Sequence, residues 1–353
     1  MRNKIFKSTI GIFIGFLFLV TFCGAALSAD KYQLRLAFEY PDKHPTVVNG
    51  IMPWIEEVKR LSNGRLEIQF FNPNALAPNR EVYSAMVAGA VDMVGSPGHY
   101  VHGKFPLNTA LQTPFTFNGA EASSLTAWDM YNENKGWADE YKEVKILWQW
   151  GSAPFQLHTV KKMVRNLEDL KGMKIIGINP QIREILKRLG ANPIDVTPPD
   201  SYLALERGMA EGMAFPLAPC RAFKITEVAK YHTIFSAMTD PFYGAINIKK
   251  WNSLPPDLQK ILTDTTGSKL SWICGQTLDG GDSVDSEGLK KEGHEFYVLP
   301  SDEKQRWADK VKDIPEEWLA DMEKKNIKGA KQVLEDVIRK GAGYSKIAPG
   351  GFK

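Results

Sequence analysis

Apolar side chains along the first half of the chain follow two different spacings. Residues 32–40 place Leu34, Leu36 and Phe38 at alternate positions, which is the pattern of a strand. Residues 46–61 instead repeat apolar side chains at helical spacing. The same patterns predict strands over 32–40, 66–71, 91–95 and 143–150, and helices over 46–61 and 79–88. Alternating strands and helices of this kind predict an α/β fold whose sheet is mostly parallel and carries helices on both faces.

The stretch from Asp169 to Gly212 predicts a second strand–helix–strand unit that leads into another helix. Two short apolar runs, 174–178 and 193–197, are typical of strands, and the amphipathic segment 181–189 between them is typical of a helix. Gly190 tolerates the left-handed conformation in which helices commonly end. We expect Asp200 to cap the helix that follows.

A long segment with helical spacing begins at Pro256 and runs towards Lys291. It contains four glycines, Gly267, Gly275, Gly280 and Gly281, each of which weakens an isolated helix by about 1 kcal/mol relative to alanine. Glycine at this density indicates close packing or a kink. Around it we predict a strand over 245–248, a strand over 296–300, helices from Ser301 onward, a last strong helix over 332–339, and a frayed end from 340 to 353.

The N-terminus has the three parts of a secretory signal peptide. Arg2, Lys4 and Lys7 precede an apolar run over 10–22, and Leu27-Ser28-Ala29 offers a cleavage site. The apolar run is short for a membrane span, which needs about 20 residues. Bulky Phe22 before Cys23 disfavours a lipoprotein. Removal of residues 1–29 lowers the formal net charge from +3 to zero, which argues against a nucleic-acid-binding protein.

No motif in the sequence predicts catalysis, a cofactor or a bound metal. Glycine-rich phosphate loops, dinucleotide fingerprints, nucleophile elbows and zinc-protease motifs are absent from the sequence. His99 and His102 lie three residues apart but lack a third ligand. Two cysteines, Cys220 and Cys274, remain after export. We interpret them as two buried unpaired thiols, and a disulfide between them is the alternative. We therefore predict a binding protein, with an exported hydrolase disfavoured.

Three motifs follow one another between Asp169 and Gly212: D-L-K-G-x-K-I, L-G-A-N-P and S-Y-x-A-L-x-x-G-x-x-x-G. In this order they resemble the solute-binding proteins of tripartite ATP-independent periplasmic (TRAP) transporters, the DctP-like family. The resemblance extends over nearly the whole mature chain. Its other pieces are the H-P near 40–45, the loop 74–78 with Arg80-Glu81, Ala90–Met93 with Gly95, T-P-F-T-F at 113–117, and 247–260.

The resemblance implies a two-lobed fold of the type II periplasmic-binding-protein kind, with a long helix that spans both lobes. The expected parts are a signal peptide (1–29), lobe I (30–150 and 243–255), lobe II (151–242), the long helix (256–292), a C-terminal strand and helices that pack on the lobes (293–340), and a tail (341–353). It further implies a periplasmic protein that closes on an organic acid and presents it to a permease of one small and one large membrane subunit. A periplasmic sensor that binds the same ligands is the alternative to transport.

The sequence departs from the family at the ligand's carboxylate. Family members usually hold this group with an arginine and a supporting asparagine, but the matching positions here are Ile176 and Phe215. Three explanations compete. Another cation, Arg221 or Arg183, substitutes; a helix N-terminus near Gln181 holds the anion; or the ligand has no carboxylate.

The apolar replacements predict a ligand with an aromatic or hydrophobic body. An aromatic or branched organic acid is the leading hypothesis, and a neutral or zwitterionic apolar solute is the second. Side chains at the C-terminal ends of strands, where ligands bind open α/β sheets, and those at family-like positions make up the predicted ligand site. They are Phe38, Glu39, Asn74, Gly98, Trp150, His158, Ile176, Tyr202, Phe215, Arg221 and Tyr243.

Overall fold

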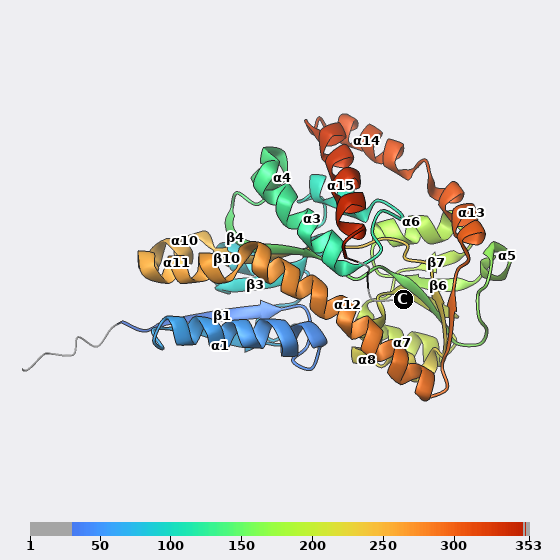
Figure 1. The fold of residues 1–353 in the computed structure, drawn as a ribbon, viewed down its shortest axis with the longest axis horizontal. Coiled ribbons are helices and arrows are strands. Elements are labelled where there is room, and N and C mark those ends of the chain that lie inside the picture. The colour runs from blue at the N-terminus through green and yellow to red at the C-terminus, as the bar shows by residue number, and fades with distance from the viewer. Residues whose placement is uncertain (1–29, 349, 351–353) are drawn as a thin grey trace, which may run out of the picture. The chain divides into compact units, whose positions relative to one another are not determined.

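Two β-sheets, each with helices around it, form the frame of the molecule in the computed structural model (Figure 1). The structure describes residues 30–348 and Gly350, so the predicted signal peptide lies outside the described residues. Residues from Lys31 onward cluster as one unit by their contacts. The first sheet belongs to lobe I and the second to lobe II.

The lobe I sheet has the strand order β2-β1-β3-β10-β4. Its strands are β1 (Tyr32–Phe38), β2 (Leu66–Phe71), β3 (Met93–Pro97), β4 (Val144–Gly151) and β10 (Pro241–Asn247). β1 pairs in parallel with β2 and β3, as the sequence predicts, whereas β10 runs antiparallel to β3 and β4. β10 enters this sheet from lobe II and therefore runs against its neighbours. It also begins four residues earlier than the predicted return strand.

The lobe II sheet has the order β11-β9-β5-β8-β6-β7. Its strands are β5 (Gln156–Thr159), β6 (Lys174–Gly177), β7 (Asn192–Ile194), β8 (Gly212–Phe215), β9 (Tyr231–Ile234) and β11 (Glu295–Val298). β5 runs antiparallel to β8 and β9, while β6 is parallel to β7 and β8. The C-terminal strand β11 joins this sheet beside β9.

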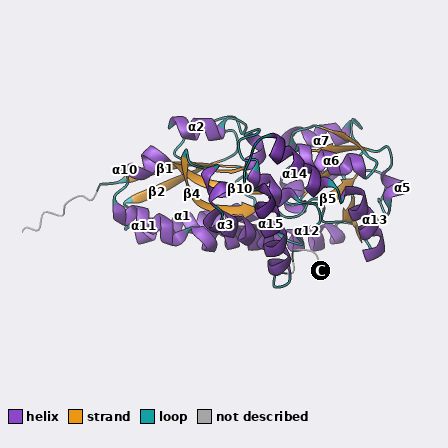
Figure 2. Cartoon of the chain, turned by 90° about the horizontal axis from the view of Figure 1, so that it is seen from above, coloured by secondary structure: helices purple, strands orange, loops and turns teal. Residues whose placement is uncertain are grey.

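Helices cover both faces of the sheets, and Figure 2 shows α2 on one side of the lobe I strands and α1 and α11 on the other. The α-helices of the first half are α1 (Met52–Leu61), α2 (Val82–Ala88), α3 (Ala120–Glu133), α4 (Lys135–Asp139), α5 (Leu167–Leu170) and α6 (Pro180–Arg188). Those that follow are α7 (Pro198–Glu206), α8 (Leu217–Ala222), α9 (Ile225–Val228), α10 (Ile248–Ser253), α11 (Pro256–Thr265), α12 (Gly267–Lys291), α13 (Ser301–Val311), α14 (Ile314–Lys324) and α15 (Ala330–Ser345). Shorter helical turns are η1 (Val47–Ile51), η2 (Gly98–Tyr100) and η3 (Leu107–Gln112).

The long segment after Pro256 forms two helices that meet at Gly267. This glycine has a φ of +62°, a left-handed value that ends the α-helical geometry of α11. Within α12, Gly275 lets the helix approach α3 closely, because a Cβ there would lie 2.6 Å from the Cα of Glu121. Close packing and a break thus both account for the glycines, although nothing packs against Gly280.

Two buried carboxylates of α12 cap helices in different lobes. Asp279 accepts hydrogen bonds from the backbone N–H groups of Ala120 (2.8 Å) and Glu121 (3.0 Å) at the start of α3. Asp282 accepts one from Ala218 (2.9 Å) in the first turn of α8. Orphan N–H groups at helix starts need such acceptors. α12 therefore contacts both lobes through polar groups as well as through packing (Figure 1).

Two extended segments link the lobes and pair with each other. The first follows β4 and the second precedes β10. Ser152 N donates to Asp240 O (2.9 Å), Phe155 N donates to Met238 O (2.9 Å), and Ala237 N donates to Phe155 O (3.0 Å). The two crossover segments are therefore hydrogen-bonded to each other as well as to the lobes that they join.

Two local expectations are wrong. Thr197, and not Asp200, is the N-cap residue of α7, because Pro198 and Pro199 begin the helix before the aspartate is reached. Residues 340–345 are not frayed, since α15 continues to Ser345. Lys340 forms ion pairs with Asp129 (3.0 Å) and Glu133 (2.9 Å) of α3, and these tertiary contacts hold the last turns.

Candidate functional site

A pocket between the two sheets is lined by both lobes and by both crossover segments. It holds about 410 Å³ of empty space, including the part that is open to solvent. Lobe I contributes the ends of β1 and β3, and lobe II contributes the end of β8 and the start of α8. Strand ends of this kind are where open α/β sheets bind ligands. We refer to this space as the inner pocket.

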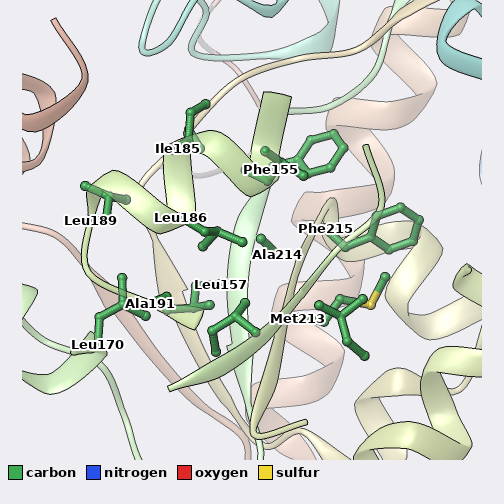
Figure 3. Close-up of a cluster of buried hydrophobic side chains, with 14 of the residues drawn as sticks. Phe155, Leu157, Leu170, Ile185, Leu186, Leu189, Ala191, Met213, Ala214 and Phe215 are labelled. Atoms are coloured by element: carbon green, nitrogen blue, oxygen red, sulfur yellow. The ribbon is translucent and has the colours of Figure 1, made fainter. Parts of the chain in front are cut away.

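Aromatic rings from both lobes form most of the pocket's wall: Tyr40, Tyr100, Phe155, Phe215, Phe223 and Phe242. Phe155 and Phe215 meet edge to face, with ring centroids 6.0 Å apart. Figure 3 shows both rings at one end of the lobe II core, away from Leu170 and Leu189. The rings thus belong to the core and also line the pocket, so their positions are fixed by packing on one side.

Glu39 supplies a half-buried carboxyl group to the pocket. Its Oε1 accepts a hydrogen bond from the Tyr100 hydroxyl (2.7 Å), and its Oε2 accepts one from the Asn79 side-chain amide (3.0 Å). Burial raises the pKa of Glu39 to about 7, although the Tyr100 hydrogen bond and the nearby His99 oppose the shift. Glu39 therefore titrates near neutral pH.

His99 and Asp240 form a second polar group in the same pocket. The Nδ1 atom of His99 lies 2.8 Å from the Oδ2 atom of Asp240. Burial lowers the pKa of His99, but the Asp240 carboxylate outweighs this effect, and the pKa is raised overall. Asp240 is itself held by the side-chain amides of Gln112 (2.5 Å) and Asn179 (3.1 Å). The pair is thus anchored from both lobes.

A wider hollow adjoins the inner pocket and shares His99, Tyr100, Ile178 and Pro198 with it. It holds about 1000 Å³, including open solvent, and Arg80 and Asn74 lie on its wall. Asn74 has a left-handed backbone and exchanges hydrogen bonds with Asn79. This outer hollow offers a route from solvent to the inner pocket.

The predicted site residues separate into three groups. Glu39 and Phe215 line the inner pocket, Asn74 lines the outer hollow, and Gly98 lines a separate hollow beside η3. Arg221 lies at another surface, where it pairs with Glu292 (3.0 Å) and Asp285 of α12. Its charge is satisfied there, and it does not line the inner pocket.

Four more predicted residues, Phe38, Trp150, Tyr243 and Ile176, lie inside hydrophobic cores, whereas Tyr202 is partly exposed. Phe38 and Trp150 stack on each other, with centroids 5.6 Å apart, and Tyr243 is buried among aromatic rings of lobe I. Ile176 is fully buried in the lobe II core. Tyr202 donates its hydroxyl to Glu206 on its own helix (2.9 Å). These side chains pack behind the pocket and do not line it.

The alternative anion partners in lobe II are also engaged elsewhere. Arg183 donates to the Gly177 carbonyl (2.8 Å) and pairs with Asp195 (3.1 Å). Gln181 follows Pro180 at the start of α6 and faces the hollow beside η3. The cap residue Asn179 already accepts from the N–H of Ile182 (2.9 Å). Neither feature lines the inner pocket.

His158 belongs to a buried chain of three histidines. Its Nε2 lies 2.9 Å from the Phe215 carbonyl oxygen, and its Nδ1 lies 2.7 Å from Nδ1 of His232. Nε2 of His232 lies 2.8 Å from Nδ1 of His294, and the Lys230 ammonium lies 3.0 Å from the last nitrogen of His294.

The two ends of this chain determine every tautomer within it. A carbonyl can only accept and an ammonium can only donate, so each ring accepts from the Lys230 side and donates towards Phe215. All three rings are then neutral. Burial lowers the pKa of His158 to about 4, which agrees with this assignment. His158 therefore supports β8 beneath Phe215 and does not face the pocket.

The predicted ligand site omits several side chains of the inner pocket: Tyr40, His99, Tyr100, Phe155, Asp240 and Phe242. The available indication for His99 is its position in the loop that follows the end of β3. Asp240 had no such indication, because only the pairing of the crossover segments brings it to His99.

Comparison with known proteins identifies the family. Residues 38–329 match the family described as bacterial extracellular solute-binding protein, family 7 (DctP). The chain belongs to this family, whose members include TRAP solute-binding proteins. The resemblance derived from the sequence motifs is thereby confirmed, and so is the two-lobed α/β fold.

Solved structures share the fold over nearly the full length. A TRAP solute-binding protein from Rhodoferax ferrireducens T118, in complex with copurified benzoate, is 26% identical, with a TM-score of 0.85 and coverage of 90% of this chain and 100% of that one. One from Bordetella bronchiseptica, with bound (R)- and (S)-mandelate, is also 26% identical, with a TM-score of 0.80 and coverage of 89% and 99%.

Relatives in the family bind chemically different acids. The 2,3-diketo-L-gulonate-binding periplasmic protein of Escherichia coli K12 is 23% identical over 70% of this chain and 75% of its own length. Solute-binding proteins of this family are extracytoplasmic and bind small molecules.

Within residues 30–348, no helix has the length and apolar character needed to cross a membrane. Cys220 and Cys274 are both buried and unpaired, as the sequence predicted.

Proposed function

We propose that this protein captures a small organic acid with an aromatic or hydrophobic body in the periplasm. It delivers the ligand to a TRAP permease made of a small and a large membrane subunit. The observation that carries the proposal is the wall of six aromatic rings around the inner pocket, contributed by both lobes. Binding of a ligand ring there removes roughly 100 Å² of apolar surface from contact with water. This burial contributes roughly 2.5 kcal/mol to the binding free energy.

Binding between the lobes would favour a closed form, because the ligand contacts both lobes only when they approach each other. The paired crossover segments would act as the hinge of this motion. Small-angle scattering with and without saturating ligand should give a smaller radius of gyration for the complex. An unchanged radius, in a protein freed of copurified ligand, would contradict this mechanism.

A thermal-shift panel tests the ligand class. Benzoate and mandelate should raise the melting temperature most, while succinate and glucuronate should raise it least. A ligand at one hundred times its dissociation constant adds about 2.7 kcal/mol to stability. Phe215→Ala should weaken the response to benzoate, and Tyr202→Phe, which removes a hydroxyl outside the pocket, should not. The largest shift from succinate or glucuronate, with none from aromatic acids, would refute the proposal.

A neutral or zwitterionic apolar solute is the second candidate. It is favoured by one observation: among the described residues, those lining the inner pocket include two carboxyl groups but no arginine or lysine. Benzyl alcohol and phenylalanine in the same panel represent this class. Mass spectrometry of the molecules that copurify with the protein would distinguish the two candidates directly. Recovery of the ligand chemically unaltered after long incubation would support binding without catalysis.

A further inference from the structure

The inner pocket contains one basic side chain among the described residues, His99. It lies in η2, directly after the end of β3, and it also lines the outer hollow. We propose that His99, held by Asp240, takes the place of the family's missing arginine as the partner of the ligand's carboxylate, and that the acid binds together with a proton. This inference rests on the proposed function and adds to it the group that recognises the anion.

The contacts of His99 leave one ring nitrogen available. Nδ1 lies 2.8 Å from Oδ2 of Asp240, an ion-pair distance without hydrogen-bond geometry, and Nε2 has no hydrogen-bond partner among the described residues. In the imidazolium form, Nε2–H is a charged donor, and a carboxylate forms its strongest hydrogen bonds with donors of that kind. The Asp240 carboxylate compensates the positive charge from behind. Asp240 is thus a positioning residue, fixed by Gln112 and Asn179.

The protonation state of Glu39 determines whether the pocket can accept the negative charge of the ligand's carboxylate. Glu39 lines the same pocket, and its two oxygens already accept from Tyr100 and Asn79. An ionised Glu39 would repel an entering carboxylate, because like charges close together in a buried site disfavour ionisation. The protonated carboxylic acid would instead donate its O–H. The charged and titratable groups around Glu39 and His99 are Asp240, Arg80, Tyr40, Tyr100 and Tyr243.

Entry of the anion therefore favours the protonated forms of both His99 and Glu39, and the proton is taken from solvent. Linkage then requires affinity to fall as pH rises. For each proton taken up, the dissociation constant should increase about tenfold per pH unit above the pKa of the free group. A cationic ligand in the same pocket would release protons, and its affinity would rise with pH.

Calorimetric titration with benzoate between pH 5.5 and 8.5, in buffers of different ionisation enthalpy, measures the protons exchanged. We expect net uptake, and a dissociation constant that rises from pH 6.5 to 8.5. His99→Gln should weaken binding at pH 6.5 at least tenfold and reduce proton uptake. Asp240→Asn should move the pH midpoint of binding to a lower value, which a purely structural role of Asp240 would not do. Arg221→Ala, outside the pocket, is the control and should match the wild type.

The possible results separate the two proposals. Benzoate binding with no proton exchange and no pH dependence would overturn the role of His99 and Glu39, while the aromatic-acid function would stand. Normal proton uptake and affinity in a folded His99→Gln variant, checked by its thermal unfolding, would also overturn it. Failure of both benzoate and mandelate to bind at any pH would refute the proposed function, and this inference with it.

Discussion

The neutral histidine chain of lobe II predicts a specific sensitivity to acid. Burial lowers the pKa of His158 from 6.5 to about 4 in the folded protein. The unfolded chain therefore binds a proton between these values when the folded protein does not. Stability rises with pH in that interval, and the contribution is lost as the pH falls below 6.5. Between pH 7.5 and 5.0, the loss for this one residue is about 2 kcal/mol.

The measurement must isolate His158, because other groups shift in the opposite sense. Burial raises the pKa of Glu140 to about 7, so protonation of this carboxyl group stabilises the folded protein as the pH falls. The free energy of unfolding of each variant is therefore to be compared with that of the wild type at the same pH. His158→Gln removes the titrating ring from the chain. On going from pH 7.5 to 5.0, it should lose about 2 kcal/mol less stability than the wild type.

Urea denaturation monitored by tryptophan fluorescence at pH 7.5, 6.5, 5.5 and 5.0 gives these free energies of unfolding. His102→Gln is the matched control, because His102 is exposed, and its curve should run parallel to that of the wild type. Proton–nitrogen NMR correlations should show Nε2–H on His158 and Nδ1–H on His232 and His294. Parallel stability curves for His158→Gln and the wild type would refute the neutral, donor-ordered chain.

Three further predictions concern stability. Gly244→Ala should lower the free energy of unfolding by about 1–3 kcal/mol, because its Cβ would lie 2.2 Å from the buried Trp148 ring. Gly280→Ala, whose Cβ would have nothing within 4 Å, should be neutral or stabilising by up to about 1 kcal/mol. Equal effects of the two substitutions in denaturation would contradict the packing argument. Asp279→Ala should cost about 1–2 kcal/mol, because two N–H groups of α3 lose their acceptor, and an unchanged melting curve would show that this cap contributes nothing. A reducing agent should leave the melting temperature unchanged, because Cys220 and Cys274 are free, and a fall in that temperature would indicate a disulfide.

Local patterns were sufficient where an element's own side chains determine its conformation. The strand Leu66–Phe71 has the predicted bounds, because its buried apolar residues Leu66 and Ile68 alternate with the more exposed polar residues Glu67 and Gln69. Helix α6 follows from its amphipathic spacing, its Asn179 cap and the proline at its start. The order of such elements, together with the motifs between Asp169 and Gly212, also determined the family. These features depend on residues close together in the chain, so they can be recognised without the fold.

The site depended instead on contacts between distant segments. Glu39 follows β1, His99 follows β3 and Asp240 precedes β10, and only the sheet order and the paired crossovers bring them into one pocket. The same packing directed Phe38, Trp150 and Ile176 into the cores, although their sequence positions suited a cleft. Side chains at a strand end can face either the core or the ligand, and local periodicity does not distinguish the two. The sequence alone therefore determined the family and the two-lobed fold, while tertiary packing decided which groups surround the inner pocket, because burial and pairing arise only when remote segments meet.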